Sequence, residues 1–251
     1  MHQYATTIRR LITNLVNPVR VLTPKEAYEL WAPTYDEREN NAVLLAEEQT
    51  ILPMFDRIQI ANKRVVDFGY GTGRHILHCL DRNAHEIVGI DISDAMLCEA
   101  RRKIKDPSVL LVQSPLDRLP FADVSFDVGI ASLVLSHLQV LGPSIHEMAR
   151  VMRPEAKLLV TDIHWKFYER RWHRTFHPSN APTLRVAPES YCHSLAEYED
   201  AFRQNHFAVD SFSEPPLNSS LRPCFERSNT IEVYERYLGE PLMVVFEVTK
   251  R

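Results

Sequence analysis

Short apolar runs alternate with helical patterns along the chain from position 64 onward. The apolar runs predict strands at Arg64–Phe68, Glu86–Asp91, Val109–Val112, Phe126–Ala131, Lys157–Asp162, His206–Phe212 and Leu242–Thr249. Helical patterns fall at 72–80, after Ser93, at 143–151 and at 193–205. This alternation is typical of repeated β-α units around a parallel sheet, so we expect an α/β fold.

The polar residues that could carry chemistry fall where predicted strands end. They are Asp67 to Gly73, Asp91, Ser114, Ala131 to Ser132, and Asp162 to His164. In open parallel sheets, ligands bind outside the carboxyl ends of the strands, where helix N-termini and backbone amides converge. We therefore expect one ligand site at this edge of the sheet.

A glycine-rich loop follows the first predicted strand. Three of the seven glycines in the chain are Gly69, Gly71 and Gly73, which indicates a tight turn that something approaches closely. An ordinary βα turn is the simplest alternative. A dinucleotide fingerprint requires a third glycine where this chain has Arg74. In addition, the acid Asp67 would repel a pyrophosphate, whereas it suits a ligand that carries an ammonium group.

A second acid, Asp91, ends the next predicted strand. A carboxylate at this place can accept hydrogen bonds from both hydroxyls of a ribose. Ile92 and Met96 follow it and could line an adenine slot. Alone, Asp91 could equally be the N-terminal acid of the next helix, but beside the glycine loop the ribose role is favoured.

The segments outside the β-α pattern predict accessory structure. Residues 1–40 predict an N-terminal helical segment, in which Ile8, Leu11, Ile12 and Leu15 share one face; it could pack on the domain or form a homodimer contact. A presequence or a membrane-surface helix would also look like this. Residues 165–191 are rich in His, Arg, Trp and Pro and predict a cap over the strand ends, within a main domain of 41–251. Prolines 215, 216 and 223 predict an irregular connection.

Composition narrows the functional classes. The formal net charge of −4 argues against a protein that binds nucleic acid through overall positive charge. The four cysteines include no C-x-x-C pair, so we expect no zinc site or other metal, and reduced thiols in a cytoplasmic protein. No apolar run of about 18 residues occurs, so we expect no stable membrane insertion.

Several motifs in this order resemble those of class I S-adenosylmethionine-dependent methyltransferases, closest to the small-molecule subgroup of the quinone and biotin pathways. They are Val66 to Gly73, Gly89 to Ser93, Leu119 to Phe121, and Arg153 with Pro154. The resemblance implies S-adenosylmethionine as cofactor. It also implies a Rossmann-like, mostly parallel seven-stranded sheet with helices on both faces, an antiparallel last strand and an N-terminal helical lid over the cofactor.

The resemblance also assigns residues. Tyr28 and Tyr35 of the N-terminal segment would contact the methionine end of the cofactor; a packed aromatic helix face is the alternative. The family's adenine-binding acid is replaced in Gln113-Ser114-Pro115, so the adenine contact would fall to Ser114, Pro115 or the backbone near Leu116. Tyr70 stands where a small residue is common and would add bulk near the methionine moiety. Gly69, Gly71, Arg74 and Ala131 complete the expected cofactor contacts.

Methyl transfer is an in-line displacement that depends mainly on orientation and exclusion of water. A hydroxyl or a protonated amine also needs a general base. His164 and His137 follow predicted strands and are the candidate bases, and Asp162 could orient either. A structural role is the alternative for both histidines.

The sequence therefore predicts an enzyme that methylates O, N or C of a small molecule. A catalytically silent cofactor-binding partner or regulatory subunit is the main alternative, because the adenine motif is weakened. A nicotinamide-dependent reductase is disfavoured by Asp67 and Arg74.

Overall fold

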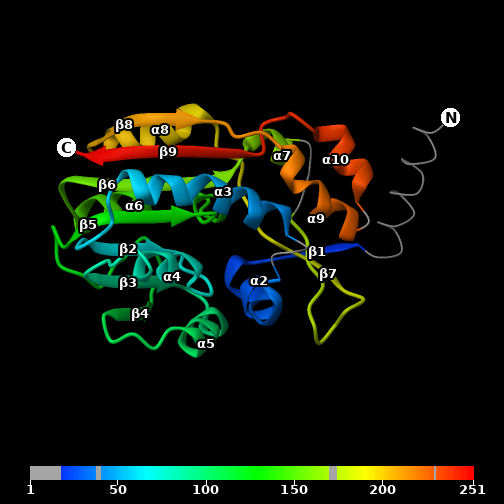
Figure 1. Cartoon of the computed structure of the whole chain (residues 1–251), viewed down its shortest axis with the longest axis horizontal. Helices are drawn as coiled ribbons and strands as arrows, with labels where there is room; N and C mark the ends of the chain where they lie inside the picture. Colours follow the sequence, from blue (N-terminus) through cyan, green and yellow to red (C-terminus); the bar gives the residue numbers. More distant parts are fainter. Residues whose placement is uncertain (1–17, 38–40, 170–173, 229) are drawn as a thin grey trace.

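The computed structural model describes residues 18–37, 41–169, 174–228 and 230–251. Its centre is a seven-stranded sheet of order β4-β3-β2-β5-β6-β9-β8, in which only β9 runs antiparallel to its neighbours (Figure 1). The strands are β2 (Arg64–Phe68), β3 (Glu86–Asp91), β4 (Val109–Gln113), β5 (Phe126–Ser132), β6 (Met152–Ile163), β8 (Phe207–Ser213) and β9 (Met243–Lys250). The expected α/β fold and antiparallel last strand are confirmed.

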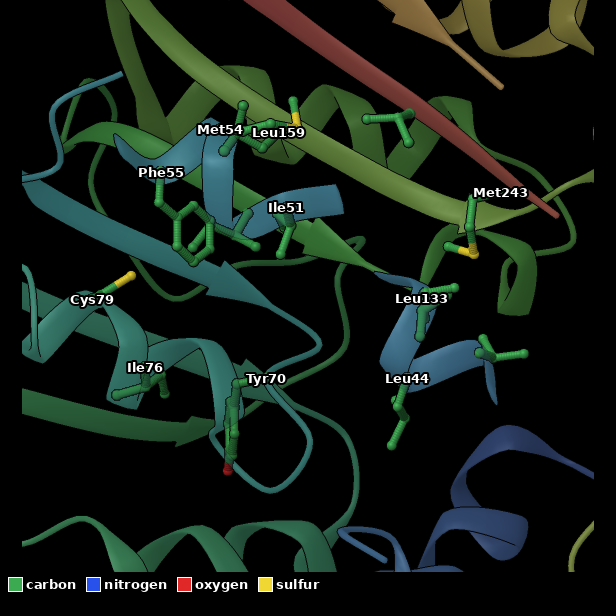
Figure 2. Packing of buried hydrophobic residues seen from close by; sticks show 14 of the residues in the cluster. Leu44, Ile51, Met54, Phe55, Tyr70, Ile76, Cys79, Leu133, Leu159 and Met243 are labelled. Carbon is green, nitrogen blue, oxygen red and sulfur yellow. The ribbon is translucent and has the colours of Figure 1, made fainter. Parts of the chain in front are cut away.

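Helices cover both faces of the sheet. On one face, α3 (Ala42–Arg57) packs against β6 and β9, α4 (Arg74–Leu80) against β2 and β3, and α5 (Asp94–Lys103) against β3 and β4, in one apolar cluster. Figure 2 shows part of this cluster, including Phe55 and Ile51 of α3 and Ile76 of α4. On the other face, α6 (Gly142–Val151) and α8 (Leu195–Gln204) pack in a second cluster around Phe202 and Phe246.

Local sequence explains where the helices begin. The Ser93 hydroxyl accepts a hydrogen bond from the Met96 amide and caps α5, as its position in the sequence predicted. Ser194 and Glu197 form a reciprocal capping box at the start of α8. These caps satisfy amides that lack partners within the helix, so the β-to-α transitions are fixed by short-range hydrogen bonds.

The described part of the N-terminal segment is not entirely helical. It contains β1 (Val19–Leu22), α2 (Pro24–Trp31) and the 3-10 helix η1 (Ala32–Thr34). Strand β1 pairs in parallel with β7 (Arg185–Pro188) of the predicted cap, and α2 packs against β7. Figure 1 shows β1, α2 and β7 beyond the ends of the main strands. The described parts of the N-terminal segment and of the cap therefore pack together in one layer, although the sequence indicated two separate features.

Two other expectations need correction or restriction. The connection before β9 is not irregular throughout, since it contains η4 (Ser219–Leu221), α9 (Arg222–Arg227) and α10 (Ile231–Tyr237). Pro223 stands in the first turn of α9, where a missing amide hydrogen costs nothing. The cap contains a short helix, α7 (Trp165–Glu169). The expected helix near residues 8–16 and the basic residues at 170–173 lie outside the described residues.

Candidate functional site

A cavity of about 540 Å³ lies at the carboxyl ends of the parallel strands. Its volume falls in the range of small-molecule and cofactor sites. It is lined by residues of the glycine loop, of the ends of β3, β4 and β5, of α2 and of the end of the cap. The residues that the sequence predicted for the site and that line this cavity are Tyr28, Tyr35, Gly69, Gly71, Asp91, Ile92, Met96, Ser114, Pro115, Leu116 and His137.

The glycine loop turns in a backbone conformation that few other residues adopt. Gly69, Gly71 and Gly73 have φ of +79°, +56° and +82°. A Cβ on Gly69 would lie 2.5 Å from Cγ2 of Val134, so the missing side chain lets the chain after β5 pack directly on the loop. Gly71 lies on the cavity wall, where a ligand can approach its backbone. The loop thus lines the cavity and also lets the chain after β5 pack directly against it.

Asp91 ends β3 with its carboxylate on the cavity wall. Its Oδ2 accepts from the Gly71 amide at 2.8 Å, and its Oδ1 accepts from the Ser93 amide at 2.9 Å. Burial raises the pKa of Asp91, and these two hydrogen bonds oppose that rise. Each carboxylate oxygen can accept a second hydrogen bond. The carboxylate is therefore held in one orientation and can still accept hydroxyl donors from a ligand.

The neighbouring wall suits a flat apolar ring. Ile92 is 42% exposed, which is high for an isoleucine, and it lines the cavity together with Met96 and Leu116. The Ser114 hydroxyl lies 3.0 Å from the Arg118 carbonyl oxygen and donates to it, which leaves the hydroxyl oxygen to accept from a ligand. Asp117 also lines this part of the cavity, and the sequence analysis missed it. Its acidic side chain, close in sequence to the expected adenine motif, could have identified it as a candidate site residue.

Helix α2 is fixed over the cavity by a contact with α5. The Glu29 carboxylate accepts from the amides of Asp94 and Ala95 at 2.8 and 3.1 Å and from the Ser93 hydroxyl at 3.2 Å. A carboxylate at a helix N-terminus is stabilised by free amides and by the helix dipole. After α2, Asp36 accepts from the Thr72 hydroxyl at 2.6 Å. The N-terminal segment is thus anchored to the start of α5 and to the glycine loop.

The chain turns sharply after β5. Leu133 has φ of +54°, a left-handed conformation that is strained for a leucine, and it precedes the 3-10 helix η3 (Leu135–His137). The buried Asp162 accepts from the Ser136 amide at 2.7 Å, and the Ser136 carbonyl accepts from the Tyr191 amide at the same distance. Asp162 therefore holds the backbone of η3 rather than the ring of either histidine.

His137 lies at the junction of three elements. Its Nε2 is 2.8 Å from the Tyr28 hydroxyl of α2, and its Nδ1 is 2.9 Å from the Glu189 carbonyl oxygen of the cap. Burial lowers the pKa of His137 to about 4, so the ring is neutral near pH 7. Glu189 and Tyr191 also line the cavity and were not singled out from the sequence.

Four expected site residues do not line this cavity. His164 is fully buried; its Nε2 is 2.7 Å from a Glu214 oxygen and its Nδ1 accepts from the Lys166 amide, so neither nitrogen faces a ligand. Ala131 points into the opposite apolar cluster, and Ser132 and Leu133 reach the cavity in its place. Strand alternation explains this shift, because successive side chains point to opposite faces.

Asp67 and Arg74 lie behind the glycine loop instead of on the wall. Neither carboxylate oxygen of Asp67 has a hydrogen-bond partner among the described residues, and burial raises its pKa to about 8. Arg74 pairs with the buried Glu47, with Nη2 2.7 Å from Oε2. Both residues, which we expected to contact the cofactor, are therefore absent from the lining of this cavity.

Tyr70 also turns away from the cavity. Its ring packs over Gly89, where a Cβ would lie 2.7 Å from Cδ1 of Tyr70, and beside Ile76 (Figure 2). The missing side chain at position 89 makes room for the ring. The bulk of Tyr70 thus fills the core instead of crowding a cofactor.

Residues of the cap line a second cavity, of about 460 Å³. Phe167, Arg174, Phe176 and His177 line it together with Trp31. Trp31 stacks on Phe176 at 4.4 Å between ring centroids and meets Tyr35 edge-on at 5.3 Å. Because Tyr35 lines the first cavity and Trp31 the second, this aromatic pair lies between the two.

Among the described residues, no group of His, Cys, Asp and Glu side chains could hold a metal ion. In the same part of the chain, no helix is long and apolar enough to cross a membrane.

Comparison with known proteins agrees with the geometry. Residues 66–160 match the model of a methyltransferase domain. The demethylmenaquinone methyltransferase of Beutenbergia cavernae is 31% identical over 135 residues, which cover 51% of this chain and 55% of that protein. The O-methyltransferase resE of Aspergillus sclerotiorum is 27% identical, with 74% of this chain and 69% of that protein covered. The chain spans about half the length of most of the curated relatives that it matches.

Solved structures share the fold. An S-adenosylmethionine-dependent methyltransferase from Mesorhizobium loti superposes with a TM-score of 0.61 at 16% identity, covering 79% of this chain and 96% of that one. The matched domain includes the glycine loop and Asp91, and it ends within β6. Residues 66–160 are thus similar to a methyltransferase domain, and the sheet has the fold of solved S-adenosylmethionine-dependent methyltransferases.

Proposed function

We propose that the protein transfers a methyl group from S-adenosylmethionine to a small-molecule metabolite. The observation that carries the proposal is a single cavity whose wall contains both the glycine loop and the fixed carboxylate of Asp91. The methyltransferase names of the relatives support the same activity.

The cofactor would lie along the strand ends. Asp91 would accept hydrogen bonds from the ribose hydroxyls, because its oxygens are oriented by backbone amides and keep free lone pairs. Ile92, Met96 and Leu116 would enclose the adenine, with Ser114 and Asp117 as acceptors for its amino group. Gly71 would allow close approach of the methionine end. When bound, the cofactor supplies a methyl group on a positively charged sulfur, which loses its charge as the methyl leaves.

The protein's main contribution would be orientation and exclusion of water. Tyr28 and Tyr35 come from the segment that Glu29 fixes against α5, and we propose that this segment acts as a lid. The acceptor would enter beside His137, Glu189 and Tyr191. The cap would thus contribute its last residues to the acceptor site.

A silent cofactor-binding subunit is the alternative from a different class. The replacement of the adenine-binding acid by Ser114 favoured it, but Asp117 lines the same part of the cavity and can take that role. We also propose a cytoplasmic location, which the four free cysteines support. A homodimer through residues 1–17 remains a proposal that concerns residues outside the described ranges.

Calorimetric titration with S-adenosylmethionine, S-adenosylhomocysteine and NADH tests the cofactor. We expect binding of the first two with Kd values of order micromolar (about −8 kcal/mol) and none of NADH. Asp91→Asn removes one acceptor and should weaken binding at least tenfold, whereas Asp81→Asn, at the exposed end of α4, should not. Binding of NADH alone would refute the proposal. Label transfer from methyl-labelled cofactor to a metabolite extract separates an enzyme from a silent binder.

A further inference from the structure

The part of the cavity proposed for the methyl acceptor contains a half-buried acid, Glu189. This residue directly follows β7 and lines the cavity together with Tyr191. The other acids on the wall are Asp91, which would hold the ribose, and the exposed Asp117, which lies beside the proposed adenine site. Among the described residues on the wall, Glu189 is therefore the acid that the proposed cofactor contacts leave unused.

The backbone that carries Glu189 is fixed on two sides. Its amide donates to the Leu22 carbonyl oxygen at 2.7 Å, and its own carbonyl oxygen lies 2.9 Å from Nδ1 of His137. Two residues later, the Tyr191 amide donates to the Ser136 carbonyl oxygen at 2.7 Å. The end of the cap is thus tied to β1 and to η3. A ligand group that binds here meets a carboxylate on a pre-organised backbone, which lowers the entropic cost of binding.

The charge of Glu189 is not neutralised by the protein. In the described part of the chain, Glu189 forms no ion pair, and its carboxylate interacts with the neutral hydroxyl of Tyr191. A carboxylate offers about four lone-pair sites, so this one can accept further hydrogen bonds. Removing a charge from water is costly unless an opposite charge compensates for it. A bound cation would supply that compensation when a ligand fills the cavity and displaces water.

Positive charge is scarce around the same space. Lys25 is the only lysine or arginine among the described residues that line this cavity, and it is exposed, so water screens its charge. Arg174 lines the second cavity, where its guanidinium lies over the rings of Trp31 and Tyr35. An anionic group at the acceptor end would therefore meet the like charge of Glu189 without a buried cation to balance it.

We propose that the methyl acceptor carries a positively charged group, a protonated amine or a guanidinium, which binds to the carboxylate of Glu189. This inference rests on the proposed function and names the class of its acceptor. Hydrogen bonds from a cation to a carboxylate are roughly twice as strong as those between neutral groups. The ring of Tyr191 lines the same wall and can add a cation–π contact. Glu189 recognises the charge of the acceptor, whichever atom of the acceptor receives the methyl group.

The same carboxylate gives the site its specificity. A like charge placed opposite a ligand suppresses the wrong partner, and electrostatic complementarity contributes more to specificity than to affinity. Acceptors that carry a carboxylate or a phosphate in place of the cation would be repelled by Glu189. Neutral acceptors of the same shape would bind without the charge-assisted contact, so they should be poorer substrates than the cations.

The first experiment determines the charge of the acceptor. The full chain is incubated with methyl-labelled S-adenosylmethionine and a metabolite extract, and the products are separated by ion exchange at pH 7. A reaction without protein identifies the unreacted cofactor, which is itself cationic. We expect labelled products that bind to a cation-exchange resin. Label found only in neutral or anionic products would overturn the inference, whereas no cofactor binding or no transfer at all would overturn the proposed function instead.

The second experiment asks whether Glu189 binds that charge. Steady-state kinetics with the labelled acceptor compare the wild type with Glu189→Gln and Lys25→Gln. Glu189→Gln keeps the shape of the side chain but removes its charge, so KM should rise about 10- to 100-fold. Its kcat should change little, because the contact is made equally in the ground state and in the transition state. Lys25→Gln should not raise KM, because it removes a charge of the same sign as the acceptor.

Two controls separate acceptor binding from other effects. Glu199→Gln, at an exposed position of α8, should leave KM unchanged. The Kd for S-adenosylmethionine, measured by calorimetry, should be little changed in Glu189→Gln. A rise in this Kd as large as the rise in KM would show that Glu189 binds the ammonium group of the cofactor, and the inference would fail. It would also fail if Glu189→Gln left KM unaltered, or if Lys25→Gln raised KM in its place.

Discussion

Nη2 of Arg74 lies 2.7 Å from Oε2 of Glu47, and both side chains are almost fully buried. The other Glu47 oxygen accepts from the hydroxyls of Ser132 and Thr161 at 2.8 and 3.1 Å. Burial favours protonation of Glu47, but the charges of His75 and Arg74 hold its pKa below the usual range. This buried ion pair joins α3 to α4, directly behind the glycine loop.

Glu47→Gln should destabilise the fold strongly, because it leaves the Arg74 guanidinium buried without a counter-charge. We expect a loss of about 3–5 kcal/mol in the free energy of unfolding, measured by denaturant titration. The adjacent Glu48→Gln is the control, since Glu48 pairs with a histidine nearer the surface. Equal losses of unfolding free energy in the two variants would show that the ion pair of Glu47 with Arg74 stabilises the fold no more than the pair of Glu48 does.

The raised pKa of the buried Asp67 predicts that the stability of the fold depends on pH. Its raised pKa means that the folded state retains the proton up to about pH 8, whereas the unfolded chain loses it near about pH 4. This group therefore lowers stability progressively as the pH rises from about 4 to about 8, by about 1.4 kcal/mol per unit of pKa difference. Asp67→Asn should remove that decline. Parallel stability curves for wild type and variant over this range would contradict the assignment.

Gly69→Ala should disturb the fold and the site together. The added Cβ would lie 2.5 Å from Val134 at a φ of +79°. Overpacking costs about 1–3 kcal/mol, to which the left-handed backbone adds strain. Relief of the clash would move Val134 and with it η3, so cofactor affinity should also fall. Gly142→Ala is the control, because nothing lies within 4 Å of its added Cβ. Thermal melts and calorimetry measure both effects.

Glu29→Ala should loosen α2 without removing any residue proposed to contact the cofactor. The variant loses the acceptor for the Asp94 and Ala95 amides, a capping contact worth about 0.5–2 kcal/mol. We expect the Kd for S-adenosylmethionine to rise by about 2- to 30-fold, mainly through faster dissociation. Glu99→Ala removes an exposed pair within α5 and should leave the Kd unchanged. Stopped-flow fluorescence distinguishes faster release from slower binding.

Much of this protein is determined by the sequence over short ranges. The strand ends, the glycine loop, Asp91 and the Ser93 cap follow from apolar periodicity and from local hydrogen bonding, and the structure has each of them. Their geometry depends on residues a few positions away, so the signals are present in the local pattern. The Rossmann-like sheet then follows from the repetition of these units.

The partners of the polar side chains were decided only by the tertiary structure. Arg74, beside the glycine loop in sequence, pairs with Glu47 of α3. His164 follows a strand as expected, yet the connection before β9 supplies Glu214 and buries it. Conversely, His137 reaches the cavity because the turn at Leu133 and the parallel pairing of β1 with β7 bring η3, α2 and the cap together. Periodicity reports which face of an element is buried, but a contact across a hundred residues depends on how whole layers pack.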